Sequence, residues 1–166
     1  MKNLLLLLLI NVSTTTIAQE DWHDAYVEAS YDDVLAFVEQ LMPNDTNECP
    51  VVCMNFVGLF DQKFKVPFTY KAEIIDGDTN RLNYINRWTS TYWPGGQFDD
   101  TFMQEVKVSH KGKDMYFFVQ EPTRPFYSKE LRKNDLLYLY LMFVGTLKIG
   151  DNEQYIFVAN DFEKIE

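Results

Sequence analysis

The segment 76–101 concentrates the side chains best suited to ligand binding. It carries five candidate ligand-binding residues: Arg87, Trp88, Tyr92, Trp93 and Phe98. Their rings can stack on sugar faces or anchor a peptide, because Trp and Tyr dominate the energetics of binding surfaces. The alternative is that the rings cap one end of the fold, since large aromatic side chains are mostly buried. We predict a site for a protein or carbohydrate ligand in this segment.

Acidic pairs and histidines are the groups that hydrolytic chemistry would need. Two acidic pairs are candidate glycosidase carboxylates: Asp32-Asp33 and Asp99-Asp100. Adjacent acids in an acidic chain are usually solvated, however, and neither His23 nor His110 lies in a G-x-S-x-G frame that would orient a nucleophile and its base. We therefore assign no catalytic residue and favour a role other than catalysis, with a polymer hydrolase as the alternative.

The stretch Asp76-Gly77-Asp78-Thr79-Asn80 begins like a calcium-binding loop. The helix-loop-helix type requires Gly at the next position, where this chain has Arg81. We expect a turn between strands there, and neither a metal nor a cofactor.

Cys49 and Cys53 are the two cysteines of the chain. Their spacing differs from the redox-active C-x-x-C, and no further Cys or His completes a zinc site. In an oxidising compartment two thiols this close in sequence can close a small loop. We expect a structural Cys49–Cys53 disulfide.

Residues 1–18 have the three-part pattern of a signal peptide: Lys2, a short apolar run, and small residues up to Ala18. The apolar run breaks at Asn11, whereas a membrane span needs about 20 apolar residues. We expect cleavage near Ala18 and export to the periplasm or the medium. The mature form would not insert into a membrane; an uncleaved N-terminal anchor is the alternative.

Composition limits the partners and the number of domains. The chain of 166 residues carries a net charge of −10, which disfavours nucleic acid because nucleic-acid binding depends on Lys and Arg. Apolar residues make up 46% and aromatic residues 16%, which favours a packed core over disorder. We expect one globular domain at 19–166.

The first element expected in this domain is an amphipathic helix at 24–42. Apolar residues follow helical spacing from Ser30 to Met42, with a helical lead-in over 24–29. Ser30 and Asp33 fit a helix cap, and Pro43 comes where the helix should end.

Strands dominate the remainder of the domain. Residues 64–75 alternate between apolar and polar types, and Pro67 should lie at an edge or a bulge because it cannot donate a ladder hydrogen bond. Within the loop 76–101 we expect a short strand at 82–88. The later elements are paired strands at 102–110 and 114–120, a short helix at 126–132, and strands at 136–147 and 154–162.

This order of elements resembles an OB-fold, a five-stranded Greek-key barrel with a helix between its third and fourth strands. The polar turn from Glu130 to Leu136 is similar to the one that leads into the fourth strand of such barrels, with Asn134 where Gly is usual. We therefore expect a mainly β (α+β) fold with an OB-like barrel over 64–163. An open β-sandwich or a roll around the N-terminal helix is the alternative.

The resemblance also implies where a ligand would bind. OB-folds bind on the face of their second and third strands and through the loop joining the first two. In this chain that loop is 76–101. The expected function is an exported binding module for protein or carbohydrate, with a polymer hydrolase or a structural subunit of an envelope assembly as alternatives.

Overall fold

A computed structural model describes residues 22–41, 52–57 and 63–166. The predicted signal peptide at 1–18 lies outside these residues. The elements follow one another as a 3-10 turn η1 (Trp22–Ala25), β1 (Val27–Glu28), α1 (Tyr31–Leu41), β2 (Val52–Phe56), β3 (Lys63–Asp76), α2 (Thr79–Tyr92), β4 (Gln104–His110), β5 (Lys113–Val119), α3 (Arg124–Glu130), β6 (Leu136–Ile149) and β7 (Asn152–Lys164).

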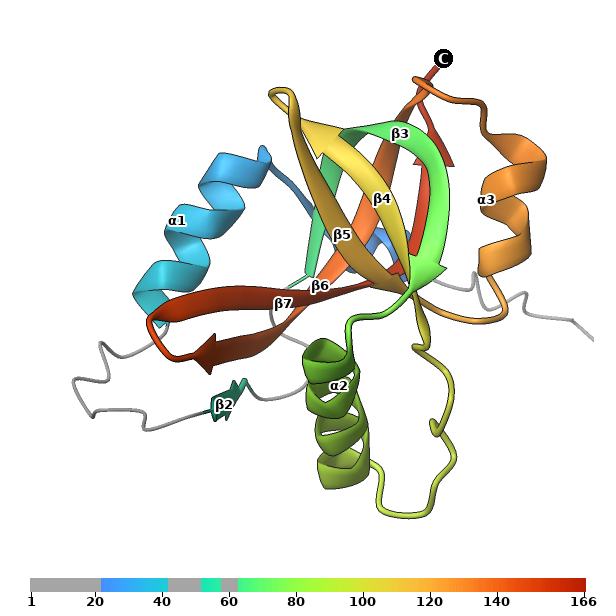
Figure 1. Cartoon of the computed structure of the whole chain (residues 1–166). Helices are drawn as coiled ribbons and strands as arrows, with labels where there is room; N and C mark the ends of the chain where they lie inside the picture. Colours follow the sequence, from blue (N-terminus) through green and yellow to red (C-terminus); the bar gives the residue numbers. More distant parts are fainter. Residues whose placement is uncertain (1–21, 42–51, 58–62) are drawn as a thin grey trace, which may run out of the picture.

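The strands form one seven-stranded mixed sheet in the order β1-β3-β4-β5-β7-β6-β2. Strand β3 pairs with both β4 and β6, so β3, β4, β5, β7 and β6 make a ring of five strands, seen in the upper half of Figure 1. The ring pairs are antiparallel except for β5 with β7, which is parallel. The expected mainly β, α+β class is confirmed.

The strands of the ring follow the predicted alternation of apolar and polar residues. In β3, Phe64, Val66, Phe68 and Tyr70 are buried and belong to one core cluster, which also takes in apolar residues of α1 and α3. Strand β6 is buried almost throughout because a second cluster covers its other face. Each face of β6 therefore packs against its own set of residues, as the unbroken apolar sequence indicated.

Pro67 lies at a local edge of β3, as its missing N–H required. On one side β3 pairs with β6, and Pro67 faces Tyr138. On the other side β1 ends opposite Lys65, and the pairing of β3 with β4 starts only at Thr69, opposite Ser109. No ladder hydrogen bond is therefore lost at Pro67 among the described strands.

The predicted helix at 24–42 is wrong in its first part. Helix α1 begins at Tyr31, whereas residues 22–25 form η1 and Val27–Glu28 forms β1, which pairs in parallel with β3. Ser30 caps the helix: its hydroxyl accepts the backbone N–H of Asp33 at 3.2 Å and donates to the Asp33 carboxylate at 2.6 Å. This cap fixes the start of α1 at the end of a strand and excludes a continuous helix.

The predicted strand at 82–88, and the loop around it, are also wrong, because residues 79–92 form helix α2. Asp78 caps α2 by accepting the backbone N–H groups of Asn80 at 3.0 Å and Arg81 at 3.2 Å. The stretch that begins like a calcium loop is thus a helix start, not a turn between strands. Tyr84, Ile85 and Trp88 are buried on one face, with the spacing of a helix.

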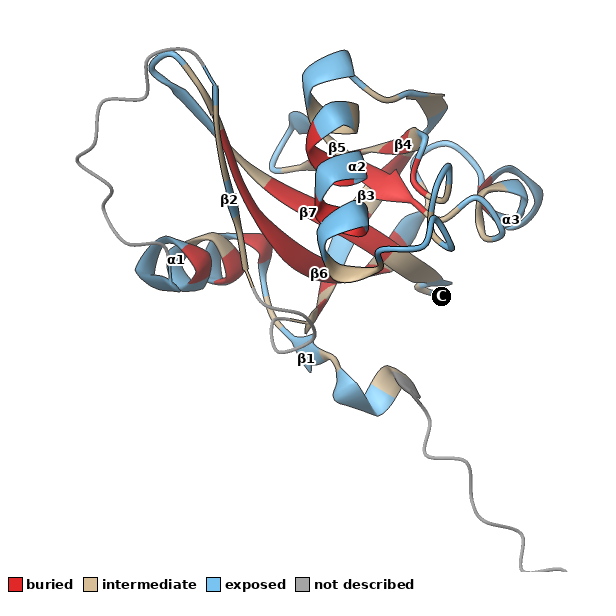
Figure 2. Ribbon diagram, turned by 90° about the horizontal axis from the view of Figure 1, so that it is seen from below, coloured by how far each residue is buried: buried red, intermediate tan, exposed pale blue. Residues whose placement is uncertain are grey.

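Helix α2 packs against the outer surface of the ring, beneath it in Figure 1 and across β6 and β7 in Figure 2. The hydroxyl of Tyr84 shares its one hydrogen between the backbone carbonyls of Asn55 at 2.7 Å and Val144 at 3.0 Å. Gly145 permits this contact, because a Cβ there would overlap both the Asn55 carbonyl and the Tyr84 hydroxyl. The helix is therefore fixed to the β2–β6 pair by buried hydrogen bonds.

In the part of the chain that the structure describes, no helix is both long and apolar enough to span a membrane.

Candidate binding sites around helix α2

A cleft opens where β5 and β7 separate. The two strands pair only at Phe118↔Val158 and Val119↔Ala159, and before these pairs they diverge, β7 running outward with β6 while β5 rises (Figure 1). The hollow between them measures about 560 Å³. We call it the β5–β7 cleft; its polar lining comes from Asp78, Asn80, Arg81, Glu105, Asp114 and Gln154. The partly buried rings of Tyr116 and Tyr155 also line it.

A buried ion pair lies in the wall of this cleft. Arg81 Nη2 is 2.6 Å from Glu105 Oε2, and the Glu105 residue is 0% exposed. The second carboxylate oxygen, Oε1, is buried and has no hydrogen-bond partner within the described part of the chain. A buried carboxylate oxygen without a partner is costly, so this group is a candidate for function.

Burial raises the pKa of Glu105 to about 7. The guanidinium of Arg81 acts in the opposite direction and lowers it, whereas the negative charge of Asp78 adds to the rise. Burial outweighs the ion pair because removing a carboxylate from water costs more than one partly exposed cation returns. Near neutral pH the cleft therefore holds a carboxyl group that can either donate or accept a hydrogen bond.

Tyr116 lies between two cations at the rim of the cleft. The charged carbon of Arg81 is 5.8 Å from the centre of its ring, and Lys107 Nζ is 5.7 Å away. Lys107 also bridges Glu73 at 3.1 Å and Asp114 at 3.2 Å, and these carboxylates raise its pKa. The tyrosine ring is thus held in place by charged side chains from α2 and β4.

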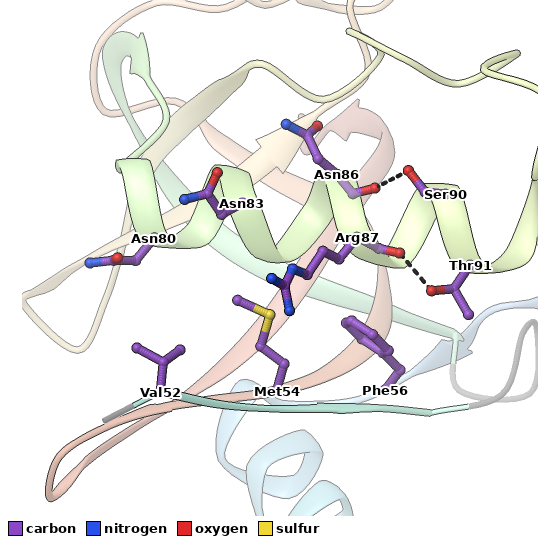
Figure 3. A pocket seen from close by; sticks show the side chains of 9 residues that line it. All are labelled: Val52, Met54, Phe56, Asn80, Asn83, Asn86, Arg87, Ser90 and Thr91. Atoms are coloured by element: carbon purple, nitrogen blue, oxygen red, sulfur yellow. Dashed lines mark hydrogen bonds between the residues drawn. The ribbon is translucent and has the colours of Figure 1, made fainter. Parts of the chain in front are cut away.

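A second hollow, of about 960 Å³, lies between α2 and β2. Figure 3 shows Val52, Met54 and Phe56 pointing up from β2 towards the helix, and Arg87 reaching down above Met54. The helix lines this α2–β2 groove with polar side chains, namely Asn80, Asn83, Asn86, Arg87, Ser90 and Thr91. It is a groove with an apolar floor and a polar wall.

A third hollow, of about 500 Å³, is formed by aromatic rings at the end of α2. Trp88, Trp93, Phe98 and Phe102 line it together with the polar side chains of Tyr26, Lys63, Gln120, Asn160 and Asp161. The ring of Trp93 packs 4.6 Å from Phe98 and 5.2 Å from Trp88. We call this the aromatic pocket.

Four of the five predicted ligand-binding residues are divided between two hollows, and Tyr92 lines neither. Arg87 is exposed in the α2–β2 groove, whereas Trp88, Trp93 and Phe98 meet in the aromatic pocket. Trp88 is only 1% exposed, which agrees with the alternative that these rings are buried. The hydroxyl of Tyr92 donates to the Val57 carbonyl at 3.1 Å. A ligand-binding role for these residues stays a prediction.

The acidic pairs named from sequence do not line the β5–β7 cleft. Asp32, at the start of α1, contacts Lys111 and lies 3.3 Å from His110, and the hydrogen bond from Lys111 is the main reason that the pKa of Asp32 is lowered. Asp99 and Asp100 are exposed in the turn after α2. The acids that do line the cleft, Asp78, Glu105 and Asp114, had not been named as candidate catalytic carboxylates.

Sequence offered no signal for Glu105. It alternates with Val106 in β4 and so belongs to the outer face, where a charged residue is expected to be solvated. Helix α2 covers that face and delivers Arg81 to it, and the helix was not foreseen. Cys53 lies in β2, whereas Cys49 is outside the described residues, so the disulfide stays a prediction.

Neither a protein-family profile nor a curated protein sequence matches this chain.

Proposed function

We propose that this protein is an exported binding module built on an OB-like Greek-key barrel and that it binds carbohydrate in the β5–β7 cleft. The order of the ring supports the barrel: counted along the chain, its strands are neighbours in the order first, second, third, fifth, fourth, and α3 stands between the third and fourth. In barrels of this kind the ligand face lies on the second and third strands, here β4 and β5.

The single observation that carries the proposal is the combination of groups in the cleft. Tyr116 and Tyr155 offer ring faces for the C–H groups of a sugar, while Arg81, Glu105 and Gln154 offer donors and acceptors for its hydroxyls. A sugar hydroxyl can be both donor and acceptor, so it suits a carboxyl group such as Glu105 in either protonation state.

The charge of the cleft favours a neutral ligand. Its cation, Arg81, is balanced by Glu105 when that carboxyl group is ionised, and Asp78 and Asp114 add negative charge in either case. A phosphate or polyanion would meet repulsion, as the net charge of the whole chain also indicates. A neutral oligosaccharide is not repelled by the charge of the cleft or by the net charge of the chain.

The test is isothermal titration calorimetry with soluble oligosaccharides derived from chitin, cellulose, mannan and xylan. We expect at least one of them to bind, and Tyr116→Ala to weaken that binding by more than 10-fold, which is the loss typical of an aromatic anchor. Tyr138→Ala, a partly exposed tyrosine on β6 whose hydroxyl contacts Glu28, is the matched control and should bind as the wild type does. Equal binding by both variants, or no binding by the wild type, would contradict the proposal.

A hydrolase is the second candidate, because the pKa of Glu105 lies in the range of a glycosidase proton donor. Asp114 and Asp78 line the same cleft and supply a second carboxylate. Chromatography of the oligosaccharides after incubation separates the two candidates. Shortened products that disappear with Glu105→Gln, while binding is retained, would establish the hydrolase in place of the binding module.

Export is tested by the mass of the protein recovered from the periplasm of an expression host. The proposal requires a mature chain beginning near Gln19 and lighter by two hydrogens than the reduced chain, for the Cys49–Cys53 bond. A protein that keeps residues 1–18 and stays with the membrane would contradict it.

A further inference from the structure

Strand β2 is at an end of the sheet and has hydrogen-bonding groups directed outward. Among the described residues it pairs with β6 alone. The N–H of Val57 donates to the Val144 carbonyl at 3.2 Å, so Val57 and the residues two and four before it direct their backbone groups towards β6. Val52, Met54 and Phe56 therefore direct their N–H and C=O groups away from the sheet.

The same three residues form the floor of the α2–β2 groove. Their side chains point towards α2 (Figure 3), while the pairing pattern directs their backbone groups to the open edge. Val52 is 42% exposed, although it is apolar. An exposed edge with an apolar face beside it is the surface to which an extended polypeptide adds as a further strand.

Helix α2 forms the opposite wall with side chains that bind peptides rather than exclude them. Asn80, Asn83 and Arg87 follow one another at helical spacing along the groove. Ser90 and Thr91 donate their hydroxyls to the backbone carbonyls of Asn86 and Arg87, each at 2.7 Å, and so present oxygen acceptors to the groove. The wall therefore offers amides, acceptors and one cation.

The charge of the groove selects the partner. Arg87 is exposed at its centre, in a protein whose net charge is −10. Among the described residues of the wall, asparagine amides and hydroxyls leave that charge unopposed. The side chain that complements Arg87 is a carboxylate, which guanidinium groups bind with two parallel hydrogen bonds.

We propose that the α2–β2 groove binds an extended polypeptide of a partner protein, which adds to β2 as an antiparallel strand and places an acidic side chain against Arg87. Antiparallel pairing matches the β2–β6 pair beside it. The five residues of β2 span about 17 Å at 3.4 Å per residue, so about five partner residues are bound. This site shares Asn80 with the β5–β7 cleft and is otherwise lined by different residues.

The geometry fixes which partner residues matter. In an antiparallel pair, residues directly opposite each other share a face. The partner residues opposite Val52, Met54 and Phe56 thus point their side chains under α2, and the same residues exchange backbone hydrogen bonds with β2. The acidic residue and its neighbours two positions away need their N–H groups, whereas the residues in between do not.

The test uses a phage-displayed library of random twelve-residue peptides, followed by fluorescence anisotropy with the enriched sequences as synthetic peptides. We expect enrichment of an acidic residue with β-branched or aromatic residues two positions away. Arg87→Glu should weaken binding by more than 10-fold, because a guanidinium–carboxylate contact becomes a repulsion. The matched control is Lys133→Glu, which makes the same change of charge in the exposed turn between α3 and β6 and should leave binding unchanged.

Methylated peptides test strand addition without altering the protein. N-methylation of the acidic residue, or of the residue two positions away, should abolish binding, whereas N-methylation of the residue between them should be tolerated. Equal tolerance at all positions would overturn the proposal. So would enriched peptides that bind Arg87→Glu as tightly as the wild type, or a sedimentation experiment showing that a second copy of the chain occupies β2. Carbohydrate binding in the cleft is measured separately, so either site can fail without the other.

Discussion

Replacing Glu105 by Gln should change how the stability of the protein depends on pH. Burial raises the pKa of Glu105 from its usual value of 4.5 to about 7, so the native state holds the proton more tightly than the unfolded chain. The contribution of this proton to stability is complete below pH 4.5 and is lost as the pH rises through 7. One pKa unit corresponds to about 1.4 kcal/mol, so the loss amounts to about 3 kcal/mol.

The glutamine variant does not titrate, so this loss should be missing from it. The assay is urea unfolding followed by tryptophan fluorescence at pH 5, 6, 7 and 8, which gives the free energy of unfolding of both proteins. The difference, variant minus wild type, should rise by about 2–3 kcal/mol from pH 5 to pH 8. Glu130→Gln, which removes an exposed carboxylate at the end of α3, is the matched control and should give a flat difference.

A flat difference for Glu105→Gln would refute the reasoning. It would mean that Glu105 is already ionised at pH 5 and that the contact with Arg81 at 2.6 Å outweighs burial.

Three further changes test how α2 is held. Gly145→Ala should destabilise the protein by more than 3 kcal/mol or prevent folding, because the new methyl group overlaps the Asn55 carbonyl and the Tyr84 hydroxyl. Urea unfolding measures the loss of unfolding free energy, and a loss below about 1 kcal/mol would contradict this packing. Tyr84→Phe should cost about 1–3 kcal/mol in the same assay, because two carbonyls lose their donor, and a neutral result would argue against both bonds. Asp78→Ala should cost about 1 kcal/mol through the lost helix cap and reduce helical circular dichroism, whereas an unchanged spectrum and midpoint would contradict the cap.

The strands of the ring could be predicted because their sequences carry their own evidence. Alternation in residues 64–75 reports one buried and one exposed face, and Lys111-Gly112-Lys113 joins two strands that pair as expected. Helix α2 was missed because Asn, Thr and Ser, which favour caps and turns over helix interiors, are frequent in 79–92. Its stability comes from tertiary contacts such as the Tyr84 hydrogen bonds, which have no local sequence signal.

The candidate sites could not be predicted from the sequence because helix α2, which lines all three of them, was not predicted. Without α2, Glu105 is one more polar residue on an alternating strand, and Arg81 has no reason to lie near it. The aromatic side chains were recognised as a group, but sequence could not decide between exposure and burial, and Trp88 is buried. Sequence singled out the segment as a candidate, whereas the distribution of its residues between the hollows required the packing of α2 on the sheet.

The most direct measurement of the central claim is an NMR titration of the ¹⁵N-labelled protein with the oligosaccharide that binds best in calorimetry. We predict saturable shifts of backbone amides at residues 114–118 and 154–157 and of the first turn of α2, with the amides of β2 unchanged. Shifts confined to the aromatic pocket or the α2–β2 groove, or no saturable shifts at all, would contradict carbohydrate binding in the β5–β7 cleft.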